Sequence, residues 1–329
     1  MYRHWQHQKQ RNSCLKEIER FVLPRHQFDA ILTAMLAPIH EKPTFIDSQT
    51  THCLSIDVEG FVESMLESFT VPESYIDRAK ESYEIRVNVE AVLELIDSLG
   101  IRATFFVLGR IAQDQPEVVR GIVSNGHEVA CHSFCHKRIS GQSPDEFRQD
   151  VRRAKNLLED IVGQEVCGFR APDFSIVSES MWELAILKEV GFKYDASLTP
   201  TDVHDVYGNP GIEKGIHALS NGLWEFPAST FSLLGKSIPF GGGGYMRLYP
   251  VWYTRRLIRK NELDGLPCML YMHPYELGPE IPEIQGISLY RKYRHYHNVS
   301  VGASRLARVV DGLRFDTALS ILRKHGLKE

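Results

Sequence analysis

The chain has 329 residues, of which 43% are hydrophobic and 24% are charged, and its formal net charge is −4. This is the composition of a globular protein with one large α/β domain or two ordinary ones. Without a basic tract, nucleic acid is not expected as a partner. No apolar run approaches the roughly 18 residues of a transmembrane helix.

Cysteine usage and the N-terminal residues bear on location. The polar, basic residues 1–12 are not followed by the apolar stretch of a secretory signal. The six cysteines, several of them in apolar strand-like runs, are therefore expected to be reduced and buried. These features predict the cytoplasm, or the inner face of the membrane, as the location.

Residues 1–50 differ in pattern from the rest of the chain. They contain two stretches of helical periodicity, at roughly residues 12–22 and 28–36, and neither carries a recognisable site. From Thr51 the pattern changes to strands that alternate with helices. We therefore expect a helical N-terminal extension over residues 1–50 and one domain over residues 51–329.

Beyond Thr51, apolar runs predict strands, and capping residues predict the helices between them. The expected strands cover residues 53–59, 104–108, 127–131, 167–170, 223–226 and 268–272. The expected helices begin at Asn88, Pro116, Ser143, Ser178 and Pro250, and a last helical stretch over residues 304–325 is expected to break near Gly312. Such repeated β–α units predict a mainly parallel sheet covered by helices. A barrel suits the candidate site residues best, because its mouth collects the carboxyl ends of all strands.

Two carboxylates and two histidines follow strand ends. Asp57 and Glu59 are two residues apart, and side chains at i and i+2 of a strand point to the same face, so both are expected in one pocket. His132 and His136 are four residues apart, which would place both imidazoles on one side of a helical turn. An isolated pair of this kind is more often a chance pair on a helix, but here both pairs follow strands.

Imidazole and carboxylate together suit zinc or a similar divalent ion. Glu59 is expected to join His132 and His136 as the third ligand, which leaves a coordination position for water, as in catalytic sites. Asp57 is then free to take a proton from the water that attacks a carbonyl. In the alternative, Asp57 only caps the turn after the strand, although an aspartate in an apolar strand is costly to bury.

Arg170, Pro172, Asp173 and His273 complete the candidate site. A buried Arg170 requires an acidic partner, and Asp57 is the candidate; the ion pair would orient the base and keep it ionised. Otherwise Arg170 is a surface arginine. Pro172 fixes the chain direction, so that the amide of Asp173 is expected to point at a developing oxyanion. His273 is placed to give a proton to a leaving amine, or else is a hydrogen-bonded core histidine.

Other residues are less specific. The tetraglycine at residues 241–244 lacks the Lys-Ser/Thr of a P-loop and is expected to form a tight loop that lines the pocket. The absence of a Gly-x-Ser-x-Gly elbow disfavours a serine hydrolase. Trp224, Tyr245 and Tyr275 either stack on a sugar ring or belong to the core.

Five motifs resemble, in order, those of the polysaccharide deacetylases with a NodB homology domain, the family-four carbohydrate esterases. They are SIDVE at residues 55–59, HSFCH at 132–136, FRAP at 169–172, WEFP at 224–227 and LYMHP at 270–274. The resemblance covers about residues 52–325. The runs at 126–132, 242–248 and 273–276 are similar to the subfamily that is linked to bacterial exopolysaccharide synthesis.

The resemblance implies a distorted (β/α) barrel of about seven strands, with residues 51–329 as a NodB-like catalytic domain. It implies a metal site of Glu59, His132 and His136, with Zn²⁺ first and Co²⁺, Ni²⁺ or Mn²⁺ as alternatives. Asp57 would be the base and His273 the acid. Many members have adjacent aspartates in the first motif, whereas here Val58 intervenes and the second carboxylate is a glutamate, which leaves the preferred metal open.

Three functions are compared. The first is a polysaccharide N-deacetylase, a hydrolase of linear amide C–N bonds, that acts on an N-acetylated glycan in exopolysaccharide or cell-surface glycan biosynthesis, in association with membrane-bound synthesis machinery. The second is an allantoinase-like hydrolase of a small cyclic amide or formamide. The third is a non-catalytic glycan-binding barrel, which the complete set of candidate residues disfavours.

Overall fold

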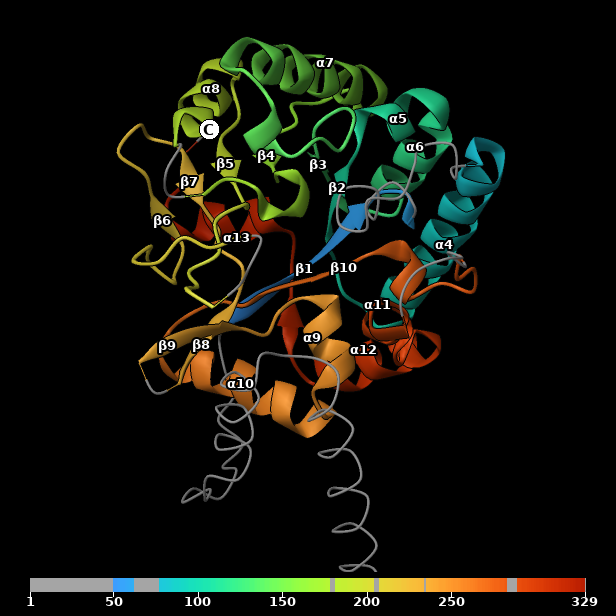
Figure 1. Cartoon of the computed structure of the whole chain (residues 1–329), viewed down its shortest axis with the longest axis vertical. Helices are drawn as coiled ribbons and strands as arrows, with labels where there is room; N and C mark the ends of the chain where they lie inside the picture. Colours follow the sequence, from blue (N-terminus) through green and yellow to red (C-terminus); the bar gives the residue numbers. More distant parts are fainter. Residues whose placement is uncertain are drawn as a thin grey trace, which may run out of the picture.

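Seven parallel strands form the centre of the computed structural model (Figure 1). The structure describes residues 50–61, 77–177, 181–203, 207–233, 235–282 and 289–328. The helices predicted before residue 50 and the predicted cap Ser178 lie outside these ranges. Within them, no helix is both long and apolar enough to cross a bilayer.

The sheet curls into a distorted barrel, as predicted. In sheet order, the parallel strands are β10 (Met269–Met272), β1 (Thr51–Val58), β2 (Thr104–Val107), β3 (Glu128–Cys131), β4 (Gly168–Phe169), β5 (Tyr194–Asp195) and β7 (Trp224–Glu225). Three further pairings extend this arrangement: β6 (His217–Ala218) antiparallel to β7, β11 (Arg314–Phe315) parallel to the start of β1, and the hairpin of β8 (Thr230–Leu233) and β9 (Lys236–Pro239).

The chain around the β8–β9 hairpin spans the opening between the two sheet edges. On one side, the Ala228 N–H donates to the Leu198 carbonyl (3.1 Å). On the other, the Tyr271 N–H donates to the Gly241 carbonyl (2.9 Å). The tetraglycine lies at this contact. Gly242 has no room for a side chain, because a Cβ on it would lie 2.4 Å from the Tyr271 hydroxyl. The closure is therefore irregular and depends on glycine for close approach.

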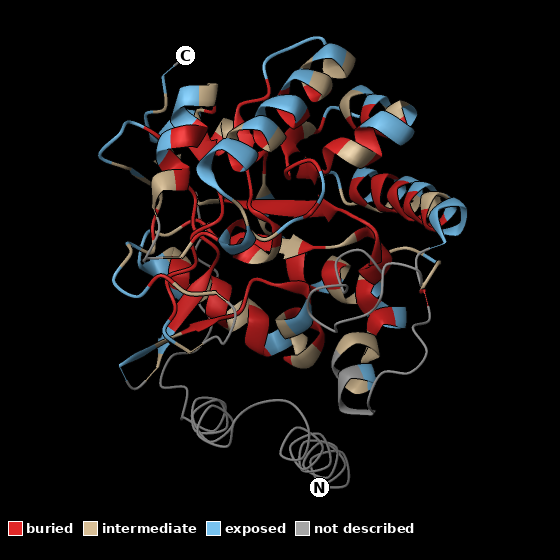
Figure 2. Cartoon of the chain, turned by 45° about the horizontal axis from the view of Figure 1, so that its top comes forward, coloured by how far each residue is buried: buried red, intermediate tan, exposed pale blue. Residues whose placement is uncertain are grey.

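The helices surround the sheet, with their exposed faces outward (Figure 2). They are α4 (Arg78–Ser98), α5 (Gly109–Asp114), α6 (Pro116–Ser124), α7 (Pro144–Val162), α8 (Trp182–Val190), α9 (Gly243–Leu248), α10 (Val251–Leu263), α11 (Leu289–Tyr296), α12 (Gly302–Val310) and α13 (Ala318–His325). The predicted start of α7 is confirmed: Ser143 and Glu146 form a capping box with Pro144 at the first helical position.

Alternation along β1 separates two apolar clusters. Leu54 and Ile56 face the cluster beneath the surrounding helices, whereas Cys53 faces the inner cluster, to which α13 contributes. Because side chains alternate, Ser55 and Asp57 share the inner face with Cys53.

The first turn of α13 closes the amino end of the barrel. The Ala318 N–H donates to Thr104 Oγ1 (2.8 Å), and the Leu319 N–H donates to Glu128 Oε2 (3.0 Å). Thr104 and Glu128 are the first residues of β2 and β3. The carboxyl ends of the strands, at the opposite end, remain for a site.

Asn88 does not cap a helix, so this prediction is wrong. Helix α4 begins ten residues earlier, where the Asp77 side chain accepts the amides of Ala79 and Lys80. Asn88 is buried in the middle of the helix, and its amide exchanges hydrogen bonds with the backbone of Glu280 (2.8 and 2.9 Å). A polar residue that satisfies distant backbone groups resembles a cap in the sequence.

The C-terminal helical stretch is interrupted near Gly312, as expected, but the interruption includes a short strand. Gly312 has a φ of 71°, and strand β11 follows it and pairs with β1. A new helix, α13, then begins with Thr317 as its N-cap.

Candidate active site

Most of the predicted functional side chains lie at the carboxyl ends of parallel strands. β1 contains Asp57 and leads to Glu59, β3 leads to His132, β4 to Arg170 and β10 to His273. Because these strands run parallel in the curled sheet, their ends face the same barrel mouth.

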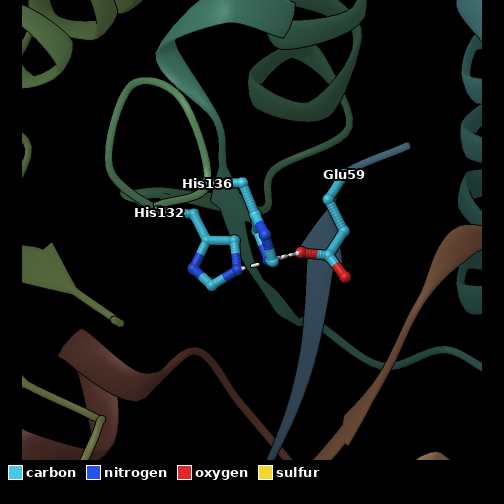
Figure 3. A group of neighbouring side chains, drawn as sticks. All are labelled: Glu59, His132 and His136. Atoms are coloured by element: carbon cyan, nitrogen blue, oxygen red, sulfur yellow. Dashed lines mark hydrogen bonds and ion pairs between the residues drawn. The ribbon is translucent and has the colours of Figure 1, made fainter. Parts of the chain in front are cut away.

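Glu59, His132 and His136 form a buried group in which one potential ligand atom from each residue lies within 4.8 Å of the others. Glu59 Oε2 lies 3.2 Å from His132 Nε2 and 2.5 Å from His136 Nε2. Figure 3 shows the three side chains turned toward one another. Two imidazole nitrogens and a carboxylate oxygen fit a divalent cation such as zinc.

The backbone of Arg170 sets the orientation of His132. The Arg170 carbonyl oxygen lies 2.8 Å from His132 Nδ1. A carbonyl oxygen only accepts, so Nδ1 carries a proton, and Nε2 is the nitrogen directed at Glu59. A hydrogen bond of this kind fixes the tautomer that a histidine needs to bind a metal.

His132 and His136 do not lie on a helical turn, so the predicted helical turn is wrong. Residues 132–138 form an irregular loop in which Ser133 and His136 have φ values of 65° and 54°. The loop carbonyls bond to helix α5 instead: Gly109 N–H donates to Ser133 O (2.9 Å), and Arg110 N–H donates to Phe134 O (3.0 Å). Left-handed residues and hydrogen bonds to α5 therefore take the place of the hydrogen bonds that a helical turn would form within the loop.

The charge of Glu59 is stabilised although the side chain is buried. Burial alone would raise the pKa of the Glu59 carboxyl. The charge of His136 and hydrogen bonds from His132, His136 and His273 outweigh burial and hold this pKa well below its ordinary value. Glu59 is therefore ionised, as a metal ligand must be.

Asp57 and Arg170 form the expected ion pair. Arg170 Nη1 lies 2.6 Å from Asp57 Oδ1 and 2.8 Å from Ser55 Oγ, and Arg170 Nε donates to the Ala196 carbonyl (3.2 Å). Arg170 is fully buried. Its guanidinium lies over the ring of Phe106, 4.1 Å from the centroid. Hydrogen bonds and ring contacts thus fix the orientation of the Arg170 guanidinium toward Asp57.

His273 has a partner that the sequence reasoning missed. Its Nδ1 lies 2.9 Å from Glu276 Oε2, and its Nε2 lies 3.2 Å from Glu59 Oε1. Arg247 Nε binds the other oxygen of Glu276 at 2.7 Å. Burial alone would raise the pKa of the Glu276 carboxyl, but Arg247 and His273 outweigh it and lower this pKa to about 2.

A sequence signal for Glu276 did exist. His273, Pro274 and Glu276 have the spacing of a capping box with proline at the first helical position, and Glu276 accepts the His273 backbone N–H (2.9 Å). Gly243 lies against the carboxylate, since a Cβ on Gly243 would lie 2.1 Å from Glu276 Oε2. Arg247 carried no comparable signal, because only the fold brings α9 to this position.

Pro172 and Asp173 lie in the short turn after β4, the 3₁₀ segment η3 (Pro172–Phe174). Asp173 has a φ of 52°, and its carboxylate lies 2.6 Å from Nε of Arg138, the last residue of the histidine loop. Phe174 also has a φ of 52°. The structure therefore brings the predicted oxyanion segment beside the loop that carries His136.

The aromatic candidates separate in space. Tyr275 is buried and stacks on the His273 ring, with centroids 5.3 Å apart. Tyr245 is half-buried on α9, with its ring 6.0 Å from that of Tyr249. Trp224 packs with the apolar cluster of α13, next to Gly326. Trp224 is thus not brought to the Glu59 group.

Two families match consecutive parts of the chain. Residues 77–194 match the family described as Polysaccharide deacetylase, and residues 196–323 match a Domain of unknown function (DUF3473). The continuous sheet crosses the boundary, because β5 pairs with β7 and β1 pairs with β10.

Curated relatives cover part of the chain. The Peptidoglycan deacetylase-like protein FGM2 of Gibberella zeae is 29% identical over 147 residues, which is 44% of this chain and 43% of the relative. The Peptidoglycan deacetylase of Helicobacter pylori is 27% identical over 47% of this chain and 52% of its own length. The Chitooligosaccharide deacetylase of a Bradyrhizobium species is 28% identical over 37% and 54%. The chain spans about half the length of these relatives.

Solved structures share the fold. A Mycobacterium smegmatis protein assigned as a polysaccharide deacetylase has a TM-score of 0.56 at 21% identity and covers 88% of this chain and 94% of its own. The Puue allantoinase has the same TM-score of 0.56 at 15% identity and covers 90% and 95%. These likenesses establish the barrel and leave the reaction to the site residues.

Proposed function

Because residues 77–194 match the polysaccharide deacetylase family, we propose that the chain is a metal-dependent hydrolase that removes N-acetyl groups from a sugar or polysaccharide. The observation that carries the proposal is the meeting of three groups at one barrel mouth. Glu59 and two histidines offer metal ligands, Asp57 is held by Arg170, and His273 is held by Glu276.

A divalent ion held by Glu59, His132 and His136 would supply Lewis-acid polarisation of the acetamide carbonyl and of the attacking water. Asp57, fixed by Arg170, accepts a proton from that water. His273 donates a proton from Nε2 to the departing sugar amine, because Glu276 occupies its Nδ1. We assign the backbone amide of Asp173, in the turn set by Pro172, to the developing oxyanion.

We propose Zn²⁺ as the ion, with Co²⁺, Ni²⁺ or Mn²⁺ as the alternatives. The support is the donor set, since two imidazoles and one carboxylate are the ligands of many catalytic zinc sites. Metal analysis of the purified protein, followed by chelation and reconstitution with each ion in turn, tests the choice. Recovery of activity with Mn²⁺ but not with Zn²⁺ would contradict it.

We propose an N-acetylated exopolysaccharide or other cell-surface glycan as the substrate and membrane-bound synthesis machinery as the partner, at the inner face of the membrane. The support is the similarity of the runs at 126–132, 242–248 and 273–276 to that subfamily, together with the relatives named for glycan deacetylation. The buried cysteines Cys53, Cys131, Cys167 and Cys268 are free thiols, which fits a reducing compartment. Cell fractionation and pull-down of the full chain test the location and the partner.

The deciding experiment measures acetate release from a panel of N-acetylated glycans. We expect chelation to abolish release and the metal to restore it. Asp57→Asn should retain the metal but lower kcat by about 10²- to 10⁴-fold, since it removes the base. Asp202→Asn, which breaks a surface pair with Lys236 (2.6 Å), is the control and should keep full activity. A fully active Asp57→Asn would overturn the assignment.

One observation favours a second candidate, the hydrolysis of a small cyclic amide or formamide. The allantoinase structure matches this chain with the same TM-score as the deacetylase neighbour. A direct comparison of N-acetylglucosamine oligomers with allantoin and simple formamides separates the two candidates. Turnover of the small amides alone would favour the second, and metal binding without turnover of either would favour a glycan-binding barrel.

A further inference from the structure

Two carboxyl side chains lie side by side in the barrel wall, where no role has been assigned to them. Asp195 ends β5 and Glu225 ends β7, and the two residues are paired in the parallel register. Both are fully buried. On its other side, Asp195 is in register with Phe169, the residue before Arg170. The pair is therefore one strand away from the arginine that holds Asp57.

We propose that Asp195 and Glu225 form a hydrogen-bonded carboxyl pair that positions Arg170 and, through it, the base Asp57. The inference rests on the function proposed above, in which Asp57 takes the proton. Neither carboxyl touches substrate in this scheme, so both are positioning residues.

The contacts of the pair converge on the three residues after β5. Asp195 Oδ1 accepts the Ser197 hydroxyl (2.6 Å), and Ser197 Oγ in turn accepts the Ala171 N–H (2.8 Å). Glu225 Oε1 accepts the Leu198 N–H (3.1 Å). The two carboxyls thus hold residues 196–198 from both sides and tie them to the residue that follows Arg170.

Arg170 depends on this segment for its orientation. Its Nε donates to the carbonyl of Ala196, which lies between Asp195 and Ser197. Its Nη1 binds Asp57 and Ser55, while its buried Nη2 has no acceptor within the described part of the chain. Because the guanidinium is planar and rigid, a shift of the Ala196 carbonyl tilts the edge that binds Asp57.

The remaining oxygens of the pair require one proton. Asp195 Oδ2 and Glu225 Oε2 are buried and have no N–H or O–H donor among the described residues if both groups are ionised. A single proton between them satisfies both atoms. Burial raises the pKa of both carboxyls, and the Asp195 charge raises that of Glu225 further, against the opposing effect of Arg170. Glu225 therefore keeps the proton and donates it to Asp195.

A protonated Glu225 also preserves the partnership of Arg170 with Asp57. If Asp195 and Glu225 were both ionised, two further negative charges one strand away would compete for the guanidinium. With one shared proton, the pair carries a single charge, which the Ser197 hydroxyl solvates.

The test compares two substitutions of Glu225 that have similar length. Glu225→Gln keeps a donor to Asp195 and should stay within about twofold of the wild-type kcat, whereas Glu225→Met removes the donor and should lower kcat by about 10- to 100-fold, with KM and metal content unchanged. Glu128→Gln is the control, because it alters a partly buried carboxyl at the amino end of the barrel and should leave kcat unchanged. Wild-type kcat in a folded Glu225→Met, or equal losses in both variants, would overturn the proposal.

Two measurements decide the proposal independently of activity. Infrared spectra of the wild type at neutral pH should contain the C=O stretch of a protonated carboxyl that Glu225→Gln removes and Glu128→Gln retains. A crystal structure of Glu225→Met should show a longer Arg170 Nη1–Asp57 Oδ1 separation than the 2.6 Å found here. Absence of the band or an unchanged separation contradicts the pair. A wild type that releases no acetate contradicts only the proposed function.

Discussion

The two halves of the barrel contribute different kinds of group to the site. Residues 51–194 supply the proposed base Asp57, the potential metal ligands and Arg170, at or just after the ends of strands. Residues 196–323, which match a domain of unknown function, supply His273, Glu276 and Arg247. The residues of the first set follow single strands. In the second set, Arg247 on α9 binds Glu276 after β10 and also donates to the carbonyls of His295 and His297. Short motifs reveal the first set and His273, whereas only tertiary packing brings Arg247 to Glu276.

The largest effect is expected when the proposed metal ligand Glu59 is removed from the first half. Glu59→Gln replaces the ionised ligand by a neutral amide beside two imidazoles, so we expect metal content and acetate release both to fall below detection. Metal analysis and an acetate assay on the same preparation measure this. Full metal occupancy in a folded Glu59→Gln would remove Glu59 from the ligand set.

Loss of the proposed acid His273 in the second half should leave metal binding by the first half intact. His273→Gln removes the proton donor, and we expect kcat to fall by about 10²- to 10⁴-fold while the metal stays bound. The contrast with Glu59→Gln separates acid from ligand. Loss of the metal in His273→Gln would instead make His273 a fourth ligand, since its Nε2 lies 3.2 Å from Glu59.

A smaller effect is expected from Arg247, which reaches the reaction only through Glu276. Arg247→Met leaves Glu276 without its cation, so that His273 is held less firmly and kcat falls by about 10- to 100-fold. Arg255→Met is the matched control, because Arg255 binds backbone carbonyls at the end of α12 (2.7–3.0 Å) and no side chain of the site. Equal kcat values for the two variants would show that Arg247 acts on stability alone.

The smallest expected effect concerns stability at acid pH. The Glu276 pKa is lowered to about 2 from an ordinary value of 4.5, so its stabilising contribution is complete above pH 4.5 and is lost as the pH falls toward about 2. This contribution is on the order of 3 kcal/mol. Glu276→Gln should therefore have a flatter free energy of unfolding than the wild type over this range, measured by urea titration. Parallel curves would contradict the ion-pair arrangement.

The sequence predicted the barrel and the first half of the site because both depend on local patterns. The spacing of Asp57 and Glu59 follows the two-residue repeat of a strand, and the barrel follows from repeated β–α units. The family resemblance then added a chemical role for each motif residue.

Predictions failed where distant backbone decides the outcome. Asn88 resembles a cap, but it bonds to the chain at residue 280. His132 and His136 have helical spacing, but the bonds of their loop to α5 impose left-handed residues. Arg247 and the Asp195–Glu225 pair have no local pattern, since each meets its partner only in the folded barrel.

The left-handed residues at the barrel mouth have an energetic consequence. Four of the six non-glycine residues with positive φ in the described chain lie in the two loops at the site: Ser133, His136, Asp173 and Phe174. Each such conformation costs about 1–3 kcal/mol, which the surrounding contacts offset. We therefore expect these loops to unfold locally before the sheet does, with faster amide hydrogen exchange than β1 or β2. The rigidity of the mouth would then depend on whatever occupies it, so that ligand binding and local folding become a single equilibrium.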